Sequence, residues 1–478
     1  MAYVDKKSLR KEFEKLKEEF IQISRTSKVP VELSIVFKSL LVLFEVMITV
    51  FLEKKVRKNN SNSHIPSSQT KKDETSPSIV GTNGNGNQEN GSLSSNTQTS
   101  ETFKTSKVDF CESCGENLKK QEAEATERRT KIDIIFKKII IHVDAEIKTC
   151  PSCDEKNKGK FPSDFQGPIQ YDGGVKSFVI SLLIGQMISL NRIKKMIKTL
   201  IEMAISEETI LKYVYNLHFS LERWECNRME DLLKMRAINC DETSLRVDKK
   251  NYWIHSYSSG DITLKFLHKN RGKEAIEDIG IIPMYGGTII HDCWSPYLFY
   301  DYCEHGLCGS HLLRELQFII DSNSFNWAKK MKKFLIKLLK KVAKRKLKRL
   351  SKTEYEKIMI LYRNIVKGGE IEMPSVPTKN NGRGRIAKSN ADNLLERFKN
   401  YEDAVLAFSR VTEVSFTNNR AERDLRMSKV KQKVSGCFRK VIFAEAYCRI
   451  SSYLQTMSNK GYNPLIAIQM ALTGSIPN

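Results

Sequence analysis

Three acidic residues, far apart in the sequence, have neighbours that suit phosphoryl-transfer chemistry. Asp241 and Asp292 each follow a largely apolar run, whereas Glu422 lies in a strongly basic stretch, residues 416–439. The cations of this stretch are candidate DNA contacts: Arg420, Arg423, Arg426, Lys429, Lys431, Lys433 and Arg439. Carboxylates brought to one point can hold divalent metal ions beside a phosphodiester. The alternative is a solvated basic helix with a Glu422–Arg426 ion pair, worth only about 0.2–0.5 kcal/mol.

The two aspartates fall in a region whose pattern is that of strands. The predicted strands are 236–247, 251–258 and 262–268, with turns at 248–250 and 259–261, followed by a helix near 274–279 and a strand at 288–290. Residues 303–311 are predicted to add a fifth strand. Three antiparallel strands, a crossover and then parallel strands are typical of a ribonuclease-H-like α/β sheet. Acids at the edge of such a sheet are well placed to hold ligands.

Four cysteines form a second candidate metal site. Cys111 and Cys114 make one C-x-x-C pair, and Cys150 and Cys153 make another, with a β-like segment between them. Four thiolates at this spacing are the ligands of a structural zinc ribbon, which leaves no open position for catalysis. The alternatives are buried cysteines paired by chance or a redox dithiol. The zinc ribbon is the favoured interpretation.

The charge of the chain favours a polyanionic partner. The 478 residues contain 79 Lys and Arg against 56 Asp and Glu, a formal net charge of +23. Nucleic acid is the preferred partner, because no device for entering a membrane is evident. The most apolar stretch, residues 36–52, is short for a membrane span and contains Lys38 and Glu45. Scattered cysteines and an N-terminus without a hydrophobic signal region predict a cytoplasmic, nucleoid-associated protein.

The segments that precede the strands have three different compositions. Residues 1–57 carry two apolar seams separated by Pro30, predicting either self-association through coiled-coil-like helices or docking on the rest of the chain. Residues 58–107 are rich in Asn, Ser, Thr and Gly and are predicted to be a disordered linker. Residues 157–230 are helical in pattern, and Ser206 is a candidate helix cap. This helical part is either a bundle, which we favour slightly, or a helix-turn-helix DNA reader.

The sequence also predicts a helical insertion between the second and third acids. Residues 329–350 hold twelve Lys or Arg residues and no acid, with apolar residues on one face. Such a helix either contacts phosphates, the favoured interpretation, or has a solvated basic face.

We therefore expect a multidomain chain built around an α/β ribonuclease-H-like core. The predicted segments are 1–57 coiled-coil-like, 58–107 linker, 108–156 zinc ribbon, 157–230 helical, 231–311 first part of the core, 312–412 basic helical insertion and 413–478 second part of the core.

Several motifs together resemble one family. The run N-N-R-A-E-R-D-L-R-M at 418–427, followed by K-V-K-Q-K-V-S-G-C-F-R, is similar to the C-terminal signature of the insertion-sequence-66 family of DDE transposases. The D-E-T at 241–243, the C-G-S-H at 308–311 and the C-x-x-C pairs match other landmarks of that family, as do the N-terminal zipper-like helix and the Asn/Ser-rich stretch at 60–68. One departure is that relatives typically have D-G-Y where this chain has Asp292-Cys293-Trp294.

The resemblance implies that Asp241, Asp292 and Glu422 are a catalytic triad holding two Mg²⁺ or Mn²⁺ ions. The implied activity is cleavage of DNA at the ends of a mobile element, followed by attack of the freed 3′-hydroxyl on target DNA. The implied partners are terminal inverted repeats, target DNA, a second copy of the chain or more, and accessory transposition proteins.

Two other functions fit part of the pattern. One is a zinc-dependent DNA-binding regulator, a domesticated protein whose nuclease-like fold is no longer used. The other is a ribonuclease-H-like nuclease that is indifferent to DNA ends. Cys308 and His311 have the C-x-x-H spacing of metal ligands, but without a second pair a buried thiol and a structural histidine are favoured. His291 is likewise interpreted as structural, since metal ions would supply the base.

Overall fold

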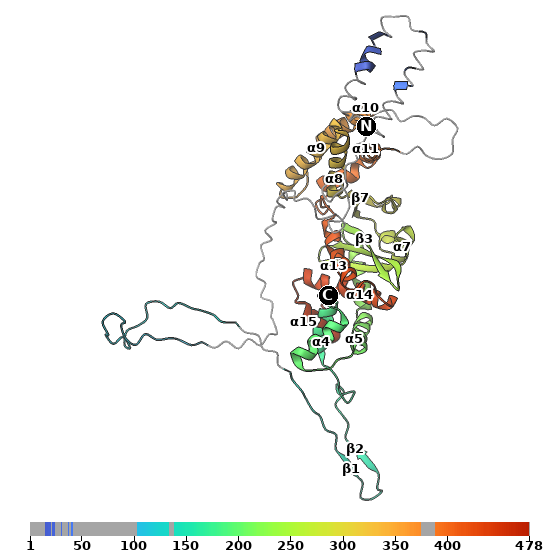
Figure 1. Cartoon of the computed structure of the whole chain (residues 1–478). Helices are drawn as coiled ribbons and strands as arrows, with labels where there is room; N and C mark the ends of the chain where they lie inside the picture. Colours follow the sequence, from blue (N-terminus) through green and yellow to red (C-terminus); the bar gives the residue numbers. More distant parts are fainter. Residues whose placement is uncertain are drawn as a thin grey trace, which may run out of the picture. The chain divides into compact units, whose positions relative to one another are not determined.

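The structure is a computed structural model, and it describes residues 15–20, 22–23, 30, 37, 40–41, 103–132, 138–373 and 388–477 (Figure 1). Most of the predicted N-terminal seams and residues 58–102 of the predicted linker lie outside these ranges. The chain divides into two compact units. Of the described residues, the larger unit contains those within 1–84 and 222–456, and the smaller contains those within 85–221 and 457–478.

A five-stranded mixed sheet forms the centre of the larger unit. Its strands are β3 (Ala237–Val247), β4 (Lys250–Ser259), β5 (Ile262–His268), β6 (Thr288–His291) and β7 (Glu304–Leu307), in the order β5-β4-β3-β6-β7. Strands β3, β4 and β5 are antiparallel neighbours, whereas β6 is parallel to β3 and β7 is parallel to β6. The predicted meander and the parallel additions are therefore confirmed.

Local sequence explains where the strands turn. Asp248 and Lys249 join β3 to β4 with φ angles of 47° and 61°, and two central residues with positive φ match the right-handed twist of a hairpin. The crossover from β5 to β6 contains α7 (Lys273–Ile279), as predicted. Strand β7 is shorter than the predicted 303–311, because Cys308 already caps the helix that follows.

Helices cover the sheet and protect its edge. Helix α13 (Asn419–Ser435) packs against β3 and β4, and α6 (Glu222–Leu233) contacts β5 (Figure 1). The edge strand β5 is closed by α14 (Val441–Asn459): Ser452 Oγ accepts from Lys265 N–H at 2.8 Å, and Thr456 Oγ1 accepts from Thr263 N–H at 3.1 Å. These bonds satisfy backbone donors that an open edge would expose.

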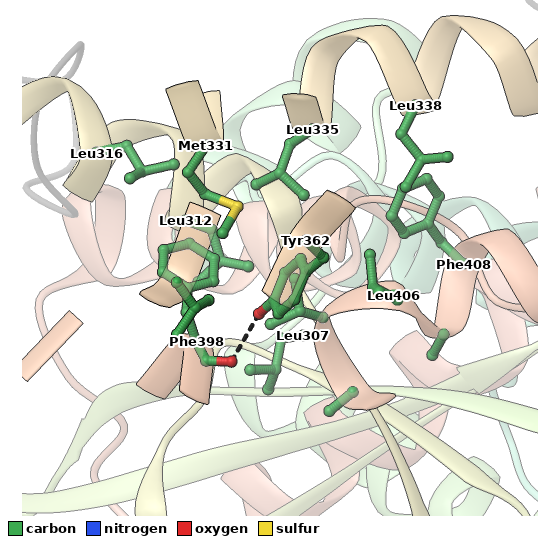
Figure 2. Packing of buried hydrophobic residues seen from close by; sticks show 14 of the residues in the cluster. Leu307, Leu312, Leu316, Met331, Leu335, Leu338, Tyr362, Phe398, Leu406 and Phe408 are labelled. Carbon is green, nitrogen blue, oxygen red and sulfur yellow. Dashed lines mark hydrogen bonds between the residues drawn. The ribbon is translucent and has the colours of Figure 1, made fainter. Parts of the chain in front are cut away.

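A helical cluster lies between β7 and α13 in the sequence. Its helices are α8 (Gly309–Asn323), α9 (Asn326–Ala343), α10 (Lys352–Glu372), α11 (Asn390–Asn400) and α12 (Glu402–Arg410). Figure 2 shows their apolar side chains meeting in one core, in which Tyr362 O–H donates to the backbone oxygen of Phe398 at 2.7 Å. Because α12 packs on β7, this core continues to the sheet.

Helix α9 is the predicted basic helix, and it ends at Ala343 rather than at Leu350. Met331, Leu335, Leu338 and Val342 are buried, as their spacing predicts. Of the intervening lysines, Lys329, Lys330, Lys333, Lys337 and Lys340 are exposed, whereas Lys332 donates to Gln317 and Lys341 pairs with Glu354.

The smaller unit consists of short helices and a two-stranded hairpin. The helices are α3 (Gly173–Ile180), α4 (Leu190–Ile201), α5 (Glu207–Ser220) and α15 (Pro464–Leu472). The predicted cap of α5 is confirmed, because Ser206 Oγ accepts from Thr209 N–H at 3.0 Å. Helix α15 packs against α3 and α5. The helix-turn-helix interpretation stays a prediction.

Among the helices that the structure describes, none has both the length and the apolar character needed to cross a membrane. The apolar stretch 36–52 contributes only residues 37, 40 and 41 to the described part of the chain.

Candidate active site

Parallel pairing brings the first two predicted acids to the same edge of the sheet. Strands β3 and β6 are in register from Ala237 opposite Thr288 to Asn239 opposite Ile290. Asp241 and Asp292 come two residues after the last of these pairs. Asp241 stays within β3, which continues beside β4, whereas Asp292 begins the turn after β6. Both aspartates therefore lie where β3 and β6 part.

The third predicted acid, Glu422, reaches this edge from the first turn of α13. Burial raises the pKa of Asp241 well above its usual range, and the negative charges of Glu242, Asp292 and Glu422 raise it further. Charges act on one another in this way only when they lie close together. The fold thus brings together three acids that are distant in the sequence, and a divalent cation fits the negative charge they concentrate.

Glu242, which was not among the predicted site residues, forms a buried network beside Asp292. Arg271 donates to Glu242 Oε1 at 2.8 Å from Nε and at 2.6 Å from a terminal nitrogen, and Tyr297 O–H donates to Oε2 at 3.0 Å. Burial raises the pKa of Glu242, and the charge of Asp292 adds to this effect. Glu242 is paired within the protein, which distinguishes it from Asp241.

The Arg271 guanidinium lies between two indole rings. It is 4.9 Å from the ring centre of Trp253 and 4.2 Å from that of Trp294, distances at which cation–π attraction acts. The backbone N–H of Trp294 also donates to Asp292 Oδ1 at 3.0 Å. The network therefore holds the turn that carries Asp292. The Asp-Glu doublet at 241–242 was the only sequence signal for it.

Asn418 fixes the start of α13 relative to β3. It is fully buried. Its Oδ1 accepts from Asn239 Nδ2 at 2.9 Å, and its Nδ2 donates to the backbone oxygen of Cys240 at 2.7 Å. The backbone oxygen of Asn418 accepts from Glu422 N–H at 3.3 Å. One side chain thus links the residues before Asp241 to the helical turn that presents Glu422. The sequence reasoning missed this role.

Cys308 and His311, at the start of α8, lie next to Glu422. His311 Nδ1 is 3.8 Å from Glu422 Oε1. The ligand atoms of the three side chains lie within 4.8 Å of one another, the only such group of three or more found in the described ranges. The backbone N–H of Asn418 donates to Cys308 Sγ at 3.1 Å, which links the start of α8 to the residues before α13. Burial raises the pKa of the Cys308 thiol.

The three predicted catalytic acids are not within 4.8 Å of one another as a set. A two-metal site does not require this spacing, because its outer carboxylates bind different ions, which lie about 3.5–4 Å apart. The charges of both Asp292 and Glu422 raise the pKa of Asp241.

The turn after β6 contains a strained residue. Cys293 has a φ of 69°, in the left-handed region that glycine adopts without steric cost. This is the second position of the Asp292-Cys293-Trp294 sequence. The backbone is held by Cys293 N–H, which donates to His291 Nδ1 at 3.1 Å.

A comparison with protein-family models identifies the family of the chain. The model described as "Transposase IS66 family" covers residues 169–446, which is more than half of the chain. The chain belongs to the IS66 transposase family. A comparison with curated proteins found no match. The matched region of this IS66 family member contains Asp241, Asp292 and Glu422, and it begins after both C-x-x-C pairs.

The cations predicted to contact DNA have two different environments in this IS66 family member. Those exposed on or just after α13 are Arg423, Arg426, Lys429, Lys433 and Arg439. Arg420 is half-buried and donates to the backbone oxygen of Ile262 at 3.1 Å. Lys431 is buried, with Nζ 5.7 Å from the ring centre of Phe438. The exposed five are available to a ligand, whereas Arg420 and Lys431 also hold α13 to its surroundings.

The two C-x-x-C pairs of this family member have the same backbone geometry. Cys111 O accepts from Gly115 N–H at 2.9 Å, and Cys150 O accepts from Asp154 N–H at 2.9 Å. Backbone N–H groups, chiefly that of Cys114, lower the pKa of Cys111, and those of Ser152 and Cys153 act likewise on Cys150. Each pair is therefore shaped as a metal knuckle.

The four cysteines do not form a completed site in the described structure. They are not among the ligating groups whose atoms lie within 4.8 Å of one another there. The zinc ribbon stays a prediction, now supported by the geometry of each half.

Proposed function

We propose that this IS66 family member is a DDE transposase that cuts DNA at the ends of a mobile element and joins the freed ends to target DNA. The observation that carries the proposal is geometric: the register of β3 and β6 puts Asp241 and Asp292 at one edge of the sheet, and Asn418 ties the start of α13, which carries Glu422, to β3. The order of strands β5-β4-β3-β6-β7, with acids on the first and fourth in sequence, supports a ribonuclease-H-like core. Family membership supports transposase activity in general.

The proposed metal ligands fit hard divalent cations. Mg²⁺ and Mn²⁺ prefer carboxylate oxygens, which Asp241, Asp292 and Glu422 supply. We propose that Asp241 is shared by both ions, while Asp292 and Glu422 each complete one of them. Bound in this way, the ions would lower the pKa of an attacking water and stabilise the charge that develops on the phosphate.

The residues around the acids would orient and hold the DNA strand. Arg423 and Arg426 are exposed on α13 within one helical turn of Glu422, so they can hold phosphates near the reacting one. Lys429, Lys433 and Arg439 extend this basic surface along the helix and beyond its end. The lysine face of α9 is a second candidate for phosphate contact. Together these surfaces would supply the electrostatic part of DNA affinity, which falls as salt rises.

We further propose that Cys111, Cys114, Cys150 and Cys153 hold a structural Zn²⁺ and that the chain works as a homodimer or higher oligomer, with accessory transposition proteins. The matched backbone geometry of the two knuckles supports the zinc site. Bringing two element ends together requires at least two DNA-binding surfaces, which favours a symmetric assembly.

The decisive test compares Asp241→Asn, Asp292→Asn and Glu422→Gln with the parent chain. The substrate is a duplex that carries the end of the element encoding the chain, with Mg²⁺. The rate of DNA cleavage by each variant is expected to fall by more than the roughly 10–100-fold that is typical when a residue only supports a metal ligand. The matched control is Glu445→Gln, an exposed carboxylate on α14, which is expected to cut and join like the parent.

The same experiment separates the alternatives. If the three variants cut and join at the parent rate, the proposed chemistry is wrong. Sequence-specific DNA binding without cleavage by any variant, parent included, favours the DNA-binding regulator. Equal cleavage of duplexes with and without the element end favours an end-indifferent nuclease.

A further inference from the structure

Cys308, His311 and Glu422 form a cluster whose ligand atoms suit a metal ion other than Mg²⁺ or Mn²⁺. Its three ligand atoms lie within 4.8 Å of one another, with His311 Nδ1 and Glu422 Oε1 3.8 Å apart. A tetrahedral Zn²⁺ with bonds of about 2.0–2.3 Å holds its ligand atoms roughly 3.3–3.8 Å from one another. Side-chain movements of about 1 Å would therefore close the group around a zinc ion.

The donor atoms of this cluster select against magnesium. A thiolate, an imidazole and a carboxylate together suit borderline and soft cations such as Zn²⁺, whereas Mg²⁺ requires an octahedron of oxygens. Three protein ligands with one open position is also the usual arrangement of a non-structural zinc site. The cluster thus differs in kind from the all-carboxylate set of Asp241, Asp292 and Glu422, with which it shares Glu422.

The fold holds two of the three ligands at the start of one helix. Cys308 is the N-cap of the fifteen-residue helix α8, and His311 N–H donates to Cys308 O at 3.1 Å. Asn418 N–H donates to Cys308 Sγ at 3.1 Å, the kind of outer hydrogen bond that orients metal ligands.

Close packing then brings Glu422 to this helix start. Gly309 N–H donates to Phe416 O at 2.7 Å, and a Cβ at Gly309 would lie 2.2 Å from the Phe416 ring. Only glycine allows this approach. It places the start of α8 against residues 416–418, which lead directly into the first turn of α13. Cys308 and Glu422 meet for this reason, although 114 positions separate them in the sequence.

We propose that Cys308, His311 and Glu422 bind a thiophilic divalent cation, Zn²⁺ being the probe of choice, and that this cation competes with the catalytic ions for Glu422. Zinc would then hold the transposase in an inactive state. Binding at the three residues stands on their geometry alone. The competition rests on the proposed function.

Metal binding is tested first, without any measurement of DNA cleavage. The full chain and its variants are equilibrated with Zn²⁺ against a competing chelator, and bound zinc per chain is measured. Cys308→Ser, His311→Gln and Glu422→Gln are each expected to bind one zinc ion fewer than the parent. Zinc held by the C-x-x-C pairs is common to all the proteins and cancels in the comparison.

A matched control shows that the loss belongs to the cluster. Cys303 is also buried, and its thiol donates to Tyr285 O at 2.9 Å, so Cys303→Ser keeps the hydrogen bond and is expected to bind as much zinc as the parent. Cys308→Ser can still accept the Asn418 N–H, which keeps the local fold. Equal zinc content in the parent and Cys308→Ser overturns the proposal.

A spectrum gives a second reading that does not depend on counting. Co²⁺ added to chains whose C-x-x-C pairs already hold zinc is expected to give a thiolate-to-cobalt absorption band in the parent and in Cys303→Ser. The band is expected to be absent in Cys308→Ser. A band of equal strength in Cys308→Ser contradicts the assignment of the thiol ligand.

To test competition, the Mg²⁺ concentration that gives half-maximal DNA cleavage is measured for each protein with and without Zn²⁺. The value with Zn²⁺ is then compared with the value for the same protein without it. Zn²⁺ is expected to raise this concentration at least about tenfold in the parent and to leave it unchanged in Cys308→Ser. Zinc that binds at the cluster without changing the Mg²⁺ requirement overturns the competition. If no protein cleaves DNA, the proposed function fails while the zinc measurements still decide the site.

Discussion

Replacing Asn418 with alanine should loosen the start of α13 and separate Glu422 from Asp241. The substitution removes two buried side-chain hydrogen bonds, to Asn239 Nδ2 and to Cys240 O. Each buried partner left without its bond costs about 1–3 kcal/mol, so the local opening free energy should fall by about 2–6 kcal/mol. The backbone bond from Asn418 N–H to Cys308 Sγ is kept, so the effect is confined to the side chain.

The change is best measured by amide hydrogen exchange, because exchange reports local opening in a chain with two units that need not unfold together. A loss of 2 kcal/mol corresponds to about 30-fold faster exchange, since each 1.4 kcal/mol is a factor of ten. Peptides covering the first turns of α13 should show at least this acceleration. Peptides in the helical cluster, such as α9, should exchange as in the parent.

Asn419→Ala is the matched control, because Asn419 is the next residue and is exposed. A substitution at such a surface position should change stability by less than about 0.5 kcal/mol. Asn418→Ala should also need more Mg²⁺ for DNA cleavage, because a mobile Glu422 binds metal less well. If α13 exchanges at the same rate in the parent, Asn418→Ala and Asn419→Ala, the reasoning that Asn418 anchors Glu422 is refuted.

Three further predictions follow from single contacts. Cys293→Gly should be more stable than Cys293→Ala by about 1 kcal/mol in melting experiments, because only alanine keeps a Cβ at a φ of 69°; equal melting temperatures contradict this. Gly309→Ala should destabilise the chain by about 1–3 kcal/mol, since the new methyl overlaps the Phe416 ring, and a neutral effect in denaturant unfolding would show that the contact can relax. Asp241→Asn should raise the melting temperature of the metal-free chain at neutral pH. The sign follows from the raised pKa of Asp241: the protonated form favours the fold below the ordinary pKa, and this stability is lost as pH rises through the folded-state value. The advantage of the variant should therefore vanish in acid, Mg²⁺ should raise the melting temperature of the parent only, and an advantage that persists in acid contradicts the electrostatic cause.

Local sequence patterns were enough to predict most elements of the sheet and the basic helix. The alternation of residues 236–268 predicts the meander, because side chains on a strand alternate between two faces and the turns are marked by short polar runs. The apolar spacing of 331–342 predicts which face of α9 is buried, because a helix repeats every 3.6 residues. In both cases the relevant neighbours are only a few positions apart.

Local patterns did not predict all the residues of the candidate active site. The apolar runs before Asp241 and Asp292, the basic stretch around Glu422 and the resemblance to a family nominated these three acids, but neither spacing nor composition indicated that Asn418 would join them. The strain at Cys293 is equally invisible in the sequence, since it depends on how the turn after β6 is held. The predicted fifth strand was too long for a related reason. Helix α8 replaces its end, and the start of α8 is stabilised by contacts with residues that come later in the sequence.

The sequence by itself determined the charge, which is a sum over the chain, and also the strands, the amphipathic helices and the two C-x-x-C pairs, which depend on residues a few positions apart. Only the tertiary structure decided that Cys308 and His311 meet Glu422, that Glu242 is neutralised by Arg271, and that Asn418 ties α13 to β3. The physical reason is that these contacts arise where a helix is packed on a sheet. Their distances are set by the close fit of residues such as Gly309 and Phe416, which no periodicity in the chain encodes.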